Sequence, residues 1–269
     1  PDSSMIRHPI RLLCLSLVFP SLVPAAVKLP SVFSDHMVLQ RDKPVPVWGW
    51  ADPGEAVTVR LGTGAESKAT ADASGRWQVA LAAVPAGGPF RLEVKASNTL
   101  VVEDVLVGEV WICSGQSNME WSVRASANAK DEIAAATHPR IRHVKFPRKP
   151  ESQPQQDQQV NWQVCSPETA GEFTAAGYFF ARTLLTELDV PIGLINTSWG
   201  GTRIEPWTPP IGFDGVPALA DIAAAVNLAT PGTPAHREKT EAYVKATEAW
   251  TTNARAAMAA AKPLAAPEP

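Results

Sequence analysis

Short apolar runs separated by turn residues dominate the chain between residues 27 and 106. In several of these runs apolar and polar side chains alternate with a period of two, as in a strand with one buried face. The runs occupy residues 44–50, 56–61, 76–81 and 90–94, with turn residues at 51–55 and 72–75. Strands at this spacing predict a small all-β sandwich. A supporting module is its simpler role, and sugar binding is the alternative.

The pattern changes after residue 107, where longer apolar runs alternate with a helical period. Residues 110–113, 141–146 and 192–196 read as buried strands, and apolar residues recur at helical spacing over 173–188. A strand, helix and strand in this order predict a parallel sheet. Residues 151–159 are polar and rich in glutamine, which predicts a surface loop.

The last part of the chain, residues 208–269, contains no strand pattern. Residues 218–261 are rich in alanine and polar side chains and are interrupted by Thr230-Pro231-Gly232-Thr233-Pro234. This composition predicts two helices separated by a break and followed by a frayed end.

The first 26 residues have the order of charges expected of an export signal. Met5 precedes cationic residues, an apolar run covers 12–19, and small residues occupy 23–26. The apolar run is too short to span a bilayer, so we expect a cleaved signal peptide and a periplasmic or secreted protein that does not remain in the membrane. Residues 1–4, ahead of the methionine, read as a leader remnant.

Composition excludes some functions. The 269 residues carry a net charge of −3 without a basic stripe, so no nucleic acid partner is expected. Cys14 lies in the predicted signal, and Cys113 and Cys165 lie in apolar contexts where we expect buried thiols, with a disulfide as the alternative. No histidine or cysteine spacing typical of a metal site occurs, and no cofactor is predicted.

The candidate chemistry begins where the strand at 110–113 ends. Ser117 follows it in a tight Gly-Gln-Ser-Asn bend, at the end of a strand where open α/β sheets place their ligands. We expect a helix to open at Glu120 and Trp121, so that its amide groups favour negative charge beside the serine. Ser117 is therefore a candidate nucleophile.

A second cluster follows the strand at 192–196. The glycine pair Gly200-Gly201 would let the backbone approach a ligand closely, and one of its amide groups could donate to an oxyanion. Next to the pair, Arg203 could bind a carboxylate, although an exposed loop arginine is an equal alternative. Glu205 is expected to brace the loop together with Trp207 rather than to contact substrate. Substrate binding by Glu205 remains the alternative.

Together these motifs resemble the sialate O-acetylesterase family of the GDSL/SGNH hydrolases, which are carbohydrate esterases. The resemblance covers about residues 27–207 and rests on three segments in order: Phe33-Ser34-Asp35-His36-Met37-Val38-Leu39-Gln40, Gly115-Gln116-Ser117-Asn118-Met119 and Gly200-Gly201-Thr202-Arg203-Ile204-Glu205-Pro206-Trp207. It implies a flavodoxin-like α/β/α domain, here incomplete, over residues 107–207.

The resemblance also implies site residues. Ser117 would be the nucleophile, and its own amide would join the oxyanion hole with that of Gly200 or, as we slightly favour, Gly201. Gln116 and Asn118 are expected to hold the bend around the serine or to contact substrate.

The sequence departs from the family in its last third. The family carries later Gln-Gly-Glu and Asp-x-x-His motifs, and neither occurs in these 269 residues. A serine needs a base within hydrogen-bond reach, and none of the scattered histidines is a good substitute.

We therefore expect the front part of an exported carbohydrate O-acetylesterase, inactive alone, whose partners are an acetylated sugar and the missing C-terminal half. The alternatives are an inactive sugar-binding or structural product and an acetyl xylan esterase. An incomplete parallel sheet would also expose an apolar edge.

Overall fold

The computed structural model describes residues 26–62, 64–151, 154–213 and 215–264. The predicted export signal therefore lies, apart from Ala26, outside the described residues. Among those residues, no helix is both long and apolar enough to cross a membrane.

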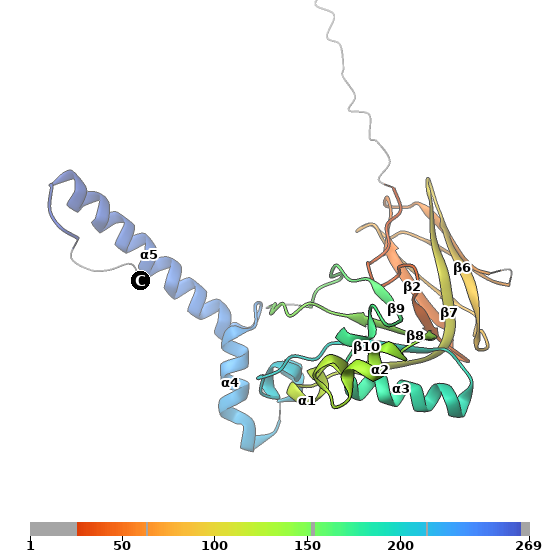
Figure 1. Cartoon of the computed structure of the whole chain (residues 1–269). Helices are drawn as coiled ribbons and strands as arrows, with labels where there is room; N and C mark the ends of the chain where they lie inside the picture. Colours follow the sequence, from red (N-terminus) through yellow and green to blue (C-terminus); the bar gives the residue numbers. More distant parts are fainter. Residues whose placement is uncertain (1–25, 63, 152–153, 214, 265–269) are drawn as a thin grey trace, which may run out of the picture.

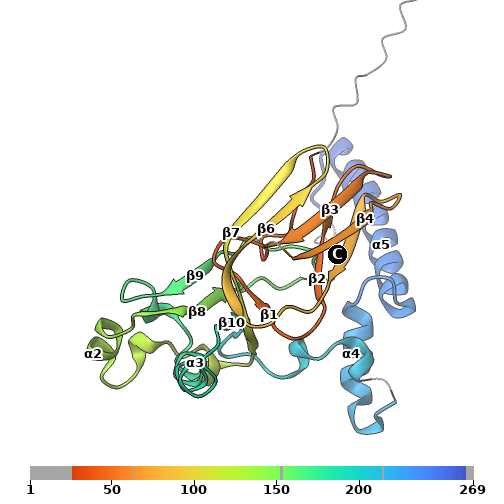
Figure 2. The same ribbon diagram turned by 90° about the vertical axis from the view of Figure 1, so that its right-hand side faces the viewer.

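The first part of the chain forms two layers of β-structure, as the alternating pattern predicted. The strands of this part are β1 (Val38–Gln40), β2 (Val45–Trp50), β3 (Ala56–Leu61), β4 (Ala65–Thr70), β5 (Arg76–Leu81), β6 (Gly87–Lys95) and β7 (Thr99–Cys113). Strands β2 and β5 make an antiparallel two-stranded sheet, which lies against the strands of the larger sheet (Figure 2). Every second side chain of these strands points into the space between the two layers. Val47, Val59 and Leu81 are among those that fill it.

The second part adds strands and helices to the same larger sheet. Its elements are α1 (Ser117–Glu120), α2 (Ala129–Ala134), β8 (His138–Lys145), β9 (Trp162–Cys165), α3 (Ala175–Leu188) and β10 (Ile192–Asn196). Strand β10 runs parallel to both β7 and β8, which confirms the predicted strand–helix–strand unit, and α3 packs on one face of it (Figure 1). Strand β9 is antiparallel to β8, so the sheet is mixed rather than purely parallel.

Strand β7 joins the two parts. Its 15 residues pair with β6 in the β-rich part and with β10 in the second part, giving one sheet with the order β4-β3-β6-β7-β10-β8-β9 and β1 paired beside β7. The boundary that the sequence pattern placed between residues 106 and 107 falls inside this strand. The two parts are therefore joined by the backbone hydrogen bonds of one continuous sheet.

The part of the larger sheet formed by β7, β8 and β10 has a separate core on each face. Ile141, Ile192 and Leu194 point to the side of α3, where Phe173 and Tyr178 are fully buried. On the other face, Val144 and Trp162 pack into the core of the β-rich part. A second helical layer, as in an α/β/α arrangement, is not formed by the described residues because the β-rich part covers this face.

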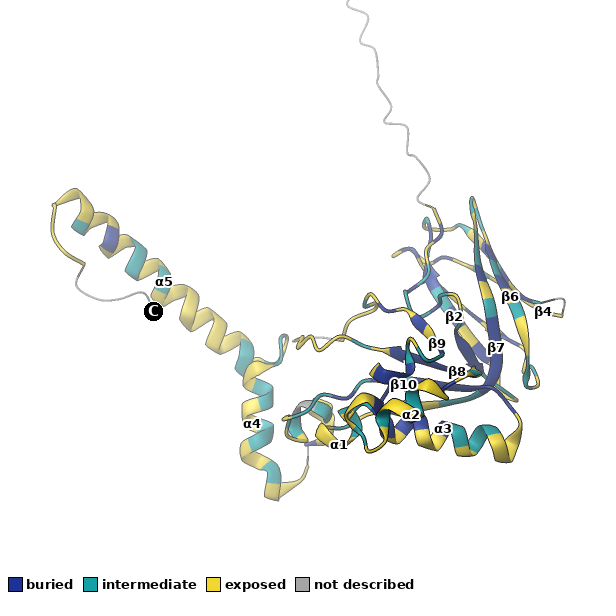
Figure 3. Ribbon diagram, viewed as in Figure 1, coloured by how far each residue is buried: buried dark blue, intermediate teal, exposed yellow. Residues whose placement is uncertain are grey.

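The last part consists of two helices, as predicted: α4 (Ala220–Ala229) and α5 (Pro234–Ala259). Thr233 caps α5 by accepting a hydrogen bond from the amide of His236 at 3.2 Å. Both helices extend away from the sheets, and the surface of α5 is exposed along most of its length (Figure 3). Short 3-10 turns connect β10 to α4, at Glu205–Trp207, Pro210–Gly212 and Pro217–Leu219. Two others lie earlier, at Val123–Ala125 and Ala170–Glu172.

Candidate functional site

Ser117 lies just beyond the carboxyl end of β7. The strand ends at Cys113, and Ser117 is exposed as the first residue of α1 (Figure 1). The bend between them passes through Gly115 at φ +131°, a conformation that other residues rarely adopt. Asn196, the last residue of β10, pairs in register with Cys113, so both strands end at the same edge of the sheet. Ser117 therefore lies beyond the carboxyl ends of the parallel strands, as predicted from the sequence.

The helix after Ser117 differs from the prediction. Instead of opening at Glu120 and Trp121, it begins at Ser117 and ends at Glu120. The helix is a single turn that starts three residues earlier than predicted, so it sums fewer peptide dipoles than a longer helix would. The bend is held instead by α3, because the Thr174 hydroxyl donates to the carbonyl of Met119 at 2.6 Å.

The second motif faces the first across the end of the sheet. The amide of Trp199 donates to the carbonyl of Gly115 at 2.8 Å, and the amide of Thr197 donates to that of Cys113 at 3.1 Å. A Cβ atom added to Gly200 would lie 3.5 Å from the Cα atom of Ser117. The tertiary structure thus places Gly200 beside Ser117, close enough that an added methyl group would touch the serine backbone.

A carboxylate that sequence reasoning had not assigned to the site links the two motifs. The amide of Gly200 donates to Oε2 of Glu120 at 2.9 Å, and Glu120 also forms an ion pair with Arg148. A Cβ atom at position 200 would lie 2.5 Å from that same oxygen. Any side chain at position 200 would therefore have to displace the Glu120 carboxylate. The only sequence signal was the position of the glutamate inside the serine motif, where we interpreted it as a helix residue.

The two glycines consequently differ in what their amide groups contact. The Gly200 amide is engaged by Glu120, whereas the amide of Gly201 has no hydrogen-bond partner among the described residues. Gly201 has φ +80° and is exposed. Of the two candidates, Gly201 is the one with a free donor.

The remaining candidate residues of the two motifs are less engaged. Gln116, Asn118 and Arg203 are exposed, and Oε2 of Glu205 is buried with no hydrogen-bond partner in the described chain. The loop is braced instead by Trp207, whose indole N–H donates to the Thr202 hydroxyl at 2.8 Å.

No base reaches the serine within the described part of the chain, where the Ser117 hydroxyl makes no hydrogen bond. His36 is engaged away from the serine, because its Nδ1 lies 2.7 Å from Oδ2 of Asp104. Burial lowers the pKa of His143 to about 3, and its ring stacks on Phe173 with centroids 4.3 Å apart. The two other described histidines lie on β8 and α5, at positions 138 and 236.

The two cysteines in the described part of the chain are free and buried, as predicted. Burial raises the pKa of both Cys113 and Cys165 to about 11, which keeps them as neutral thiols at physiological pH. Neither thiol is therefore a nucleophile that competes with Ser117.

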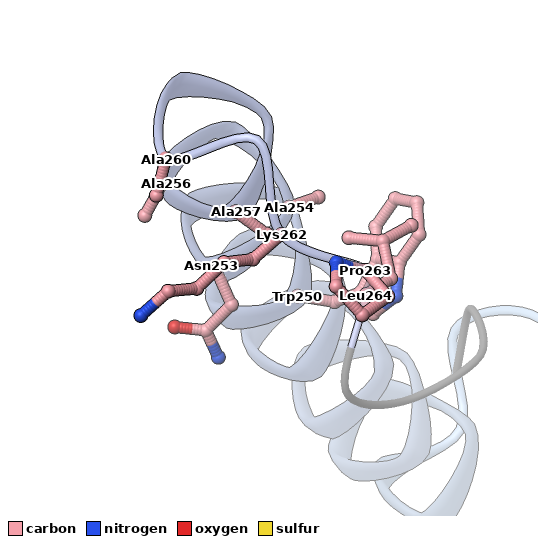
Figure 4. A pocket seen from close by; sticks show the side chains of 9 residues that line it. All are labelled: Trp250, Asn253, Ala254, Ala256, Ala257, Ala260, Lys262, Pro263 and Leu264. Atoms are coloured by element: carbon pink, nitrogen blue, oxygen red, sulfur yellow. The ribbon is translucent and has the colours of Figure 1, made fainter.

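One hollow of the molecule lies far along the chain from the serine motif. It has a volume of about 430 Å³ and lies at the end of α5, where residues 262–264 fold back beside Trp250 (Figure 4). Alanine side chains form much of its wall, and no residue of either motif lines it. This hollow is therefore separate from the two motifs.

Comparisons with known proteins show which family this chain is similar to. Residues 107–227 match the family described as carbohydrate esterase, sialic acid-specific acetylesterase. The sialate O-acetylesterase of Homo sapiens is 35% identical over 225 residues, which is 73% of this chain and 42% of that protein. That of Mus musculus is 37% identical over 206 residues, or 67% of this chain and 37% of that protein.

A solved structure is similar as well. The crystal structure of a carbohydrate acetylesterase from Xanthomonas citri aligns with a TM-score of 0.67 and 42% identity, covering 70% of this chain and 44% of that one. The chain therefore spans less than half the length of the relatives that it matches.

Proposed function

Because this chain belongs to the sialate O-acetylesterase family of carbohydrate esterases, we propose that it supplies the nucleophile for removing acetyl groups from sugars. The observation that carries the proposal is the position of the exposed Ser117 beside the loop of Gly200 and Gly201, at the carboxyl ends of β7 and β10. We infer that the sheet around this site is the incomplete flavodoxin-like arrangement of the SGNH hydrolases, and that the β-rich part is the sandwich preceding it.

In the proposed reaction, the Ser117 hydroxyl attacks the acetyl carbonyl and its proton passes to a base. The amides of Ser117 and Gly201 donate to the oxyanion of the tetrahedral intermediate. Collapse of the intermediate breaks the bond to the sugar oxygen, which leaves protonated, and forms an acetyl-serine. Water then hydrolyses this ester and releases acetate.

The chain's own contribution is positioning. Glu120 accepts a hydrogen bond from the Gly200 amide, and we infer that this bond fixes the loop that presents the Gly201 amide. We propose that the base comes from an Asp-x-x-His segment beyond these 269 residues or on a separate chain. Arg203, exposed beside the glycines, is the residue that we propose to meet a carboxylate on a sialic acid.

The test is the change Ser117→Ala in the full-length product of the gene. We expect release of acetate from an O-acetylated sialic acid to fall to the uncatalysed rate, because no other hydroxyl can form the acetyl-enzyme. The matched change Ser114→Ala, at an exposed serine of the same bend, should leave turnover in place. Unchanged turnover in the Ser117 variant would end the proposal. Acetylated xylan, assayed in parallel, separates the two sugar classes.

The lack of a base near Ser117 in the described chain favours a second candidate, a product that binds sugar without hydrolysing it. The purified chain assayed on 4-nitrophenyl acetate separates the two. Turnover that disappears in the Ser117 variant refutes the non-catalytic product. Turnover equal to that of the Ser117→Ala variant supports the non-catalytic product for this chain alone.

We also propose export, on the order of charged, apolar and small residues over 5–26. N-terminal sequencing of the mature protein should then find a start near Val27, and retention of the first 26 residues would contradict export.

A further inference from the structure

The outward face of the small β2–β5 sheet carries two tryptophans in a row. Trp48 and Trp50 alternate with the buried residues of β2, and both are half-buried, Trp48 partly through its packing against the buried Phe33. The antiparallel register places Gln78 opposite Trp48 and Arg76 opposite Trp50, and both of these residues are exposed. This face therefore combines aromatic surface with hydrogen-bonding groups.

Two hollows meet on this face. The first has a volume of about 530 Å³ and lies between Trp48, Phe146 and the polar loop at residues 155–158. The second has a volume of about 330 Å³ and lies over Trp50, Gln78 and Arg76. Both are lined by Trp48 and Gln156, so the two hollows are neighbours on one surface.

The walls of these hollows are held in place by contacts outside them. The edge of Trp48 packs against the ring of Phe33, with centroids 4.7 Å apart and an interplanar angle of 77°. The polar loop is anchored because Asp157 accepts a hydrogen bond from the amide of Ser31 at 2.8 Å. A surface that is already ordered loses little conformational entropy when it binds a ligand.

A buried donor beside the second hollow lacks an acceptor. Trp77 lines that hollow and is 3% exposed, and its indole N–H has no hydrogen-bond partner in the described chain. Buried polar groups are usually satisfied, and an orphan in a native structure often marks a place where a water or ligand binds.

The chemistry of this surface suits sugar rings. A pyranose presents C–H groups on its faces and hydroxyls on its rim, so it matches indole rings edged by amides. Trp48 and Trp50 are two residues apart on one strand, a rise of about 6.7 Å along the backbone, so both lie within the span of a short oligosaccharide.

The charges around the two hollows do not favour an anion. Lys149 is paired with Glu151 at 2.5 Å, and Arg76 lies on the same wall as Asp72. Asp157 adds a third carboxylate, so a polyanion would meet more carboxylates than cations there. The surface therefore favours an uncharged ligand.

We propose that the tryptophan face, defined as Trp48, Trp50, Gln78 and Gln156, binds a neutral oligosaccharide chain. Its sugar rings stack on the two indoles, and its hydroxyls hydrogen-bond to the two amides. The site lies in the β-rich part rather than at Ser117, so it would hold a polysaccharide carrying acetyl groups without taking part in the reaction. This inference extends the proposed function, but it does not depend on hydrolysis.

Isothermal titration of the purified chain with xylohexaose, cellohexaose and mannohexaose tests the proposal. We expect saturable binding of at least one hexasaccharide, weakened about tenfold by Trp50→Ala because one stacking platform is lost. The matched change Tyr243→Ala removes an aromatic ring that is 53% exposed on α5 and should leave the affinity unchanged. No saturable binding to any of the three sugars would overturn the proposal, as would binding of tetrasialic acid alone.

A second variant controls for the possibility that Trp50→Ala weakens binding by unfolding the protein. Gln78 is exposed, so Gln78→Ala should fold normally and should still weaken binding severalfold. Unchanged affinity in this variant together with unchanged affinity in a folded Trp50→Ala variant would refute the tryptophan face. Ser117→Ala should bind the sugars normally, and this keeps a failure here distinct from a failure of the esterase proposal.

Discussion

At the scale of single residues, the carboxylate of Glu120 is the least anticipated feature of the site. It joins the serine bend to the glycine loop through the Gly200 amide and carries an ion pair to Arg148. A charged acceptor makes a stronger hydrogen bond than a neutral one, typically about 1.5–3 kcal/mol. The position of the proposed oxyanion donors therefore depends on a side chain to which the proposed reaction gives no direct part.

The change Gly200→Ala tests this link. The new Cβ atom would lie 2.5 Å from Oε2 of Glu120, so it must displace the carboxylate and break its hydrogen bond. We expect urea unfolding to show a free energy of unfolding lower by about 1.5–3 kcal/mol. The change Gly64→Ala, at a position with open space around it, is the matched control. In a Glu120→Ala background the cost at position 200 should be smaller, and an equal cost would contradict the link.

At the scale of elements, β7 determines where the sheet can grow. On the edge away from β10, β1 pairs with residues 106–108, and the Gln40 side chain accepts a hydrogen bond from the amide of Val110 at 3.0 Å. Past Val110 no described strand pairs with that edge. Trp111 is 43% exposed there and Ile112 is 69% exposed. An apolar strand edge of this kind invites pairing with another chain.

The change Ile112→Lys should reduce self-association of the purified chain. We expect the native sequence to form larger species as concentration rises in sedimentation velocity, and the lysine variant to remain monomeric to higher concentration. Met258→Lys alters a residue that is 77% exposed on α5 and should not change the profile. A native chain that stays monomeric at every concentration would argue against an adhesive edge.

At the scale of the whole molecule, the two parts are joined by polar as well as apolar contacts. Arg142 of β8 is 5% exposed and donates to Asp104 of β7 at 2.7 Å, and His36 contacts the same carboxylate. Burial alone would raise the pKa of Asp104, but the hydrogen bonds from Arg142 and His36 outweigh it, and the pKa is lowered. This cluster ties the motif around His36 to the sheet that carries Ser117.

The stability of the whole fold should decrease in mild acid because of His143. Its pKa is about 3 in the folded protein, mainly through burial, and about 6.5 in an unfolded chain. Between these values the unfolded state binds a proton that the folded state excludes. Stability therefore falls as the pH decreases from about 6.5 toward 3, by at most about 1.4 kcal/mol per unit.

The variant His143→Phe keeps a ring on Phe173 but removes the titration. Urea unfolding at pH 7.5, 6 and 4.5 should show a shallower loss of stability in the variant than in the native chain. Above pH 7 the difference between the two proteins should be constant, which provides the internal control. Parallel curves throughout the acid range would contradict this role.

Several elements followed from the sequence because they depend on local periodicity. The positions of β2, β3, β5, α3 and β10 were predicted to within a residue or two, since alternating or helical spacing records which side of an element is buried. The adjacency of Ser117 and the glycine pair also followed, because parallel strands end at the same edge of a sheet.

The tertiary structure alone decided the rest. The continuity of β7 through both parts, the bond from Gly200 to Glu120 and the pairing of Trp48 with Gln78 all join residues far apart in the chain. Periodicity tells which face of a segment avoids water. Which polar group meets which partner depends on the register and crossing of elements, and these are set only when the whole chain packs.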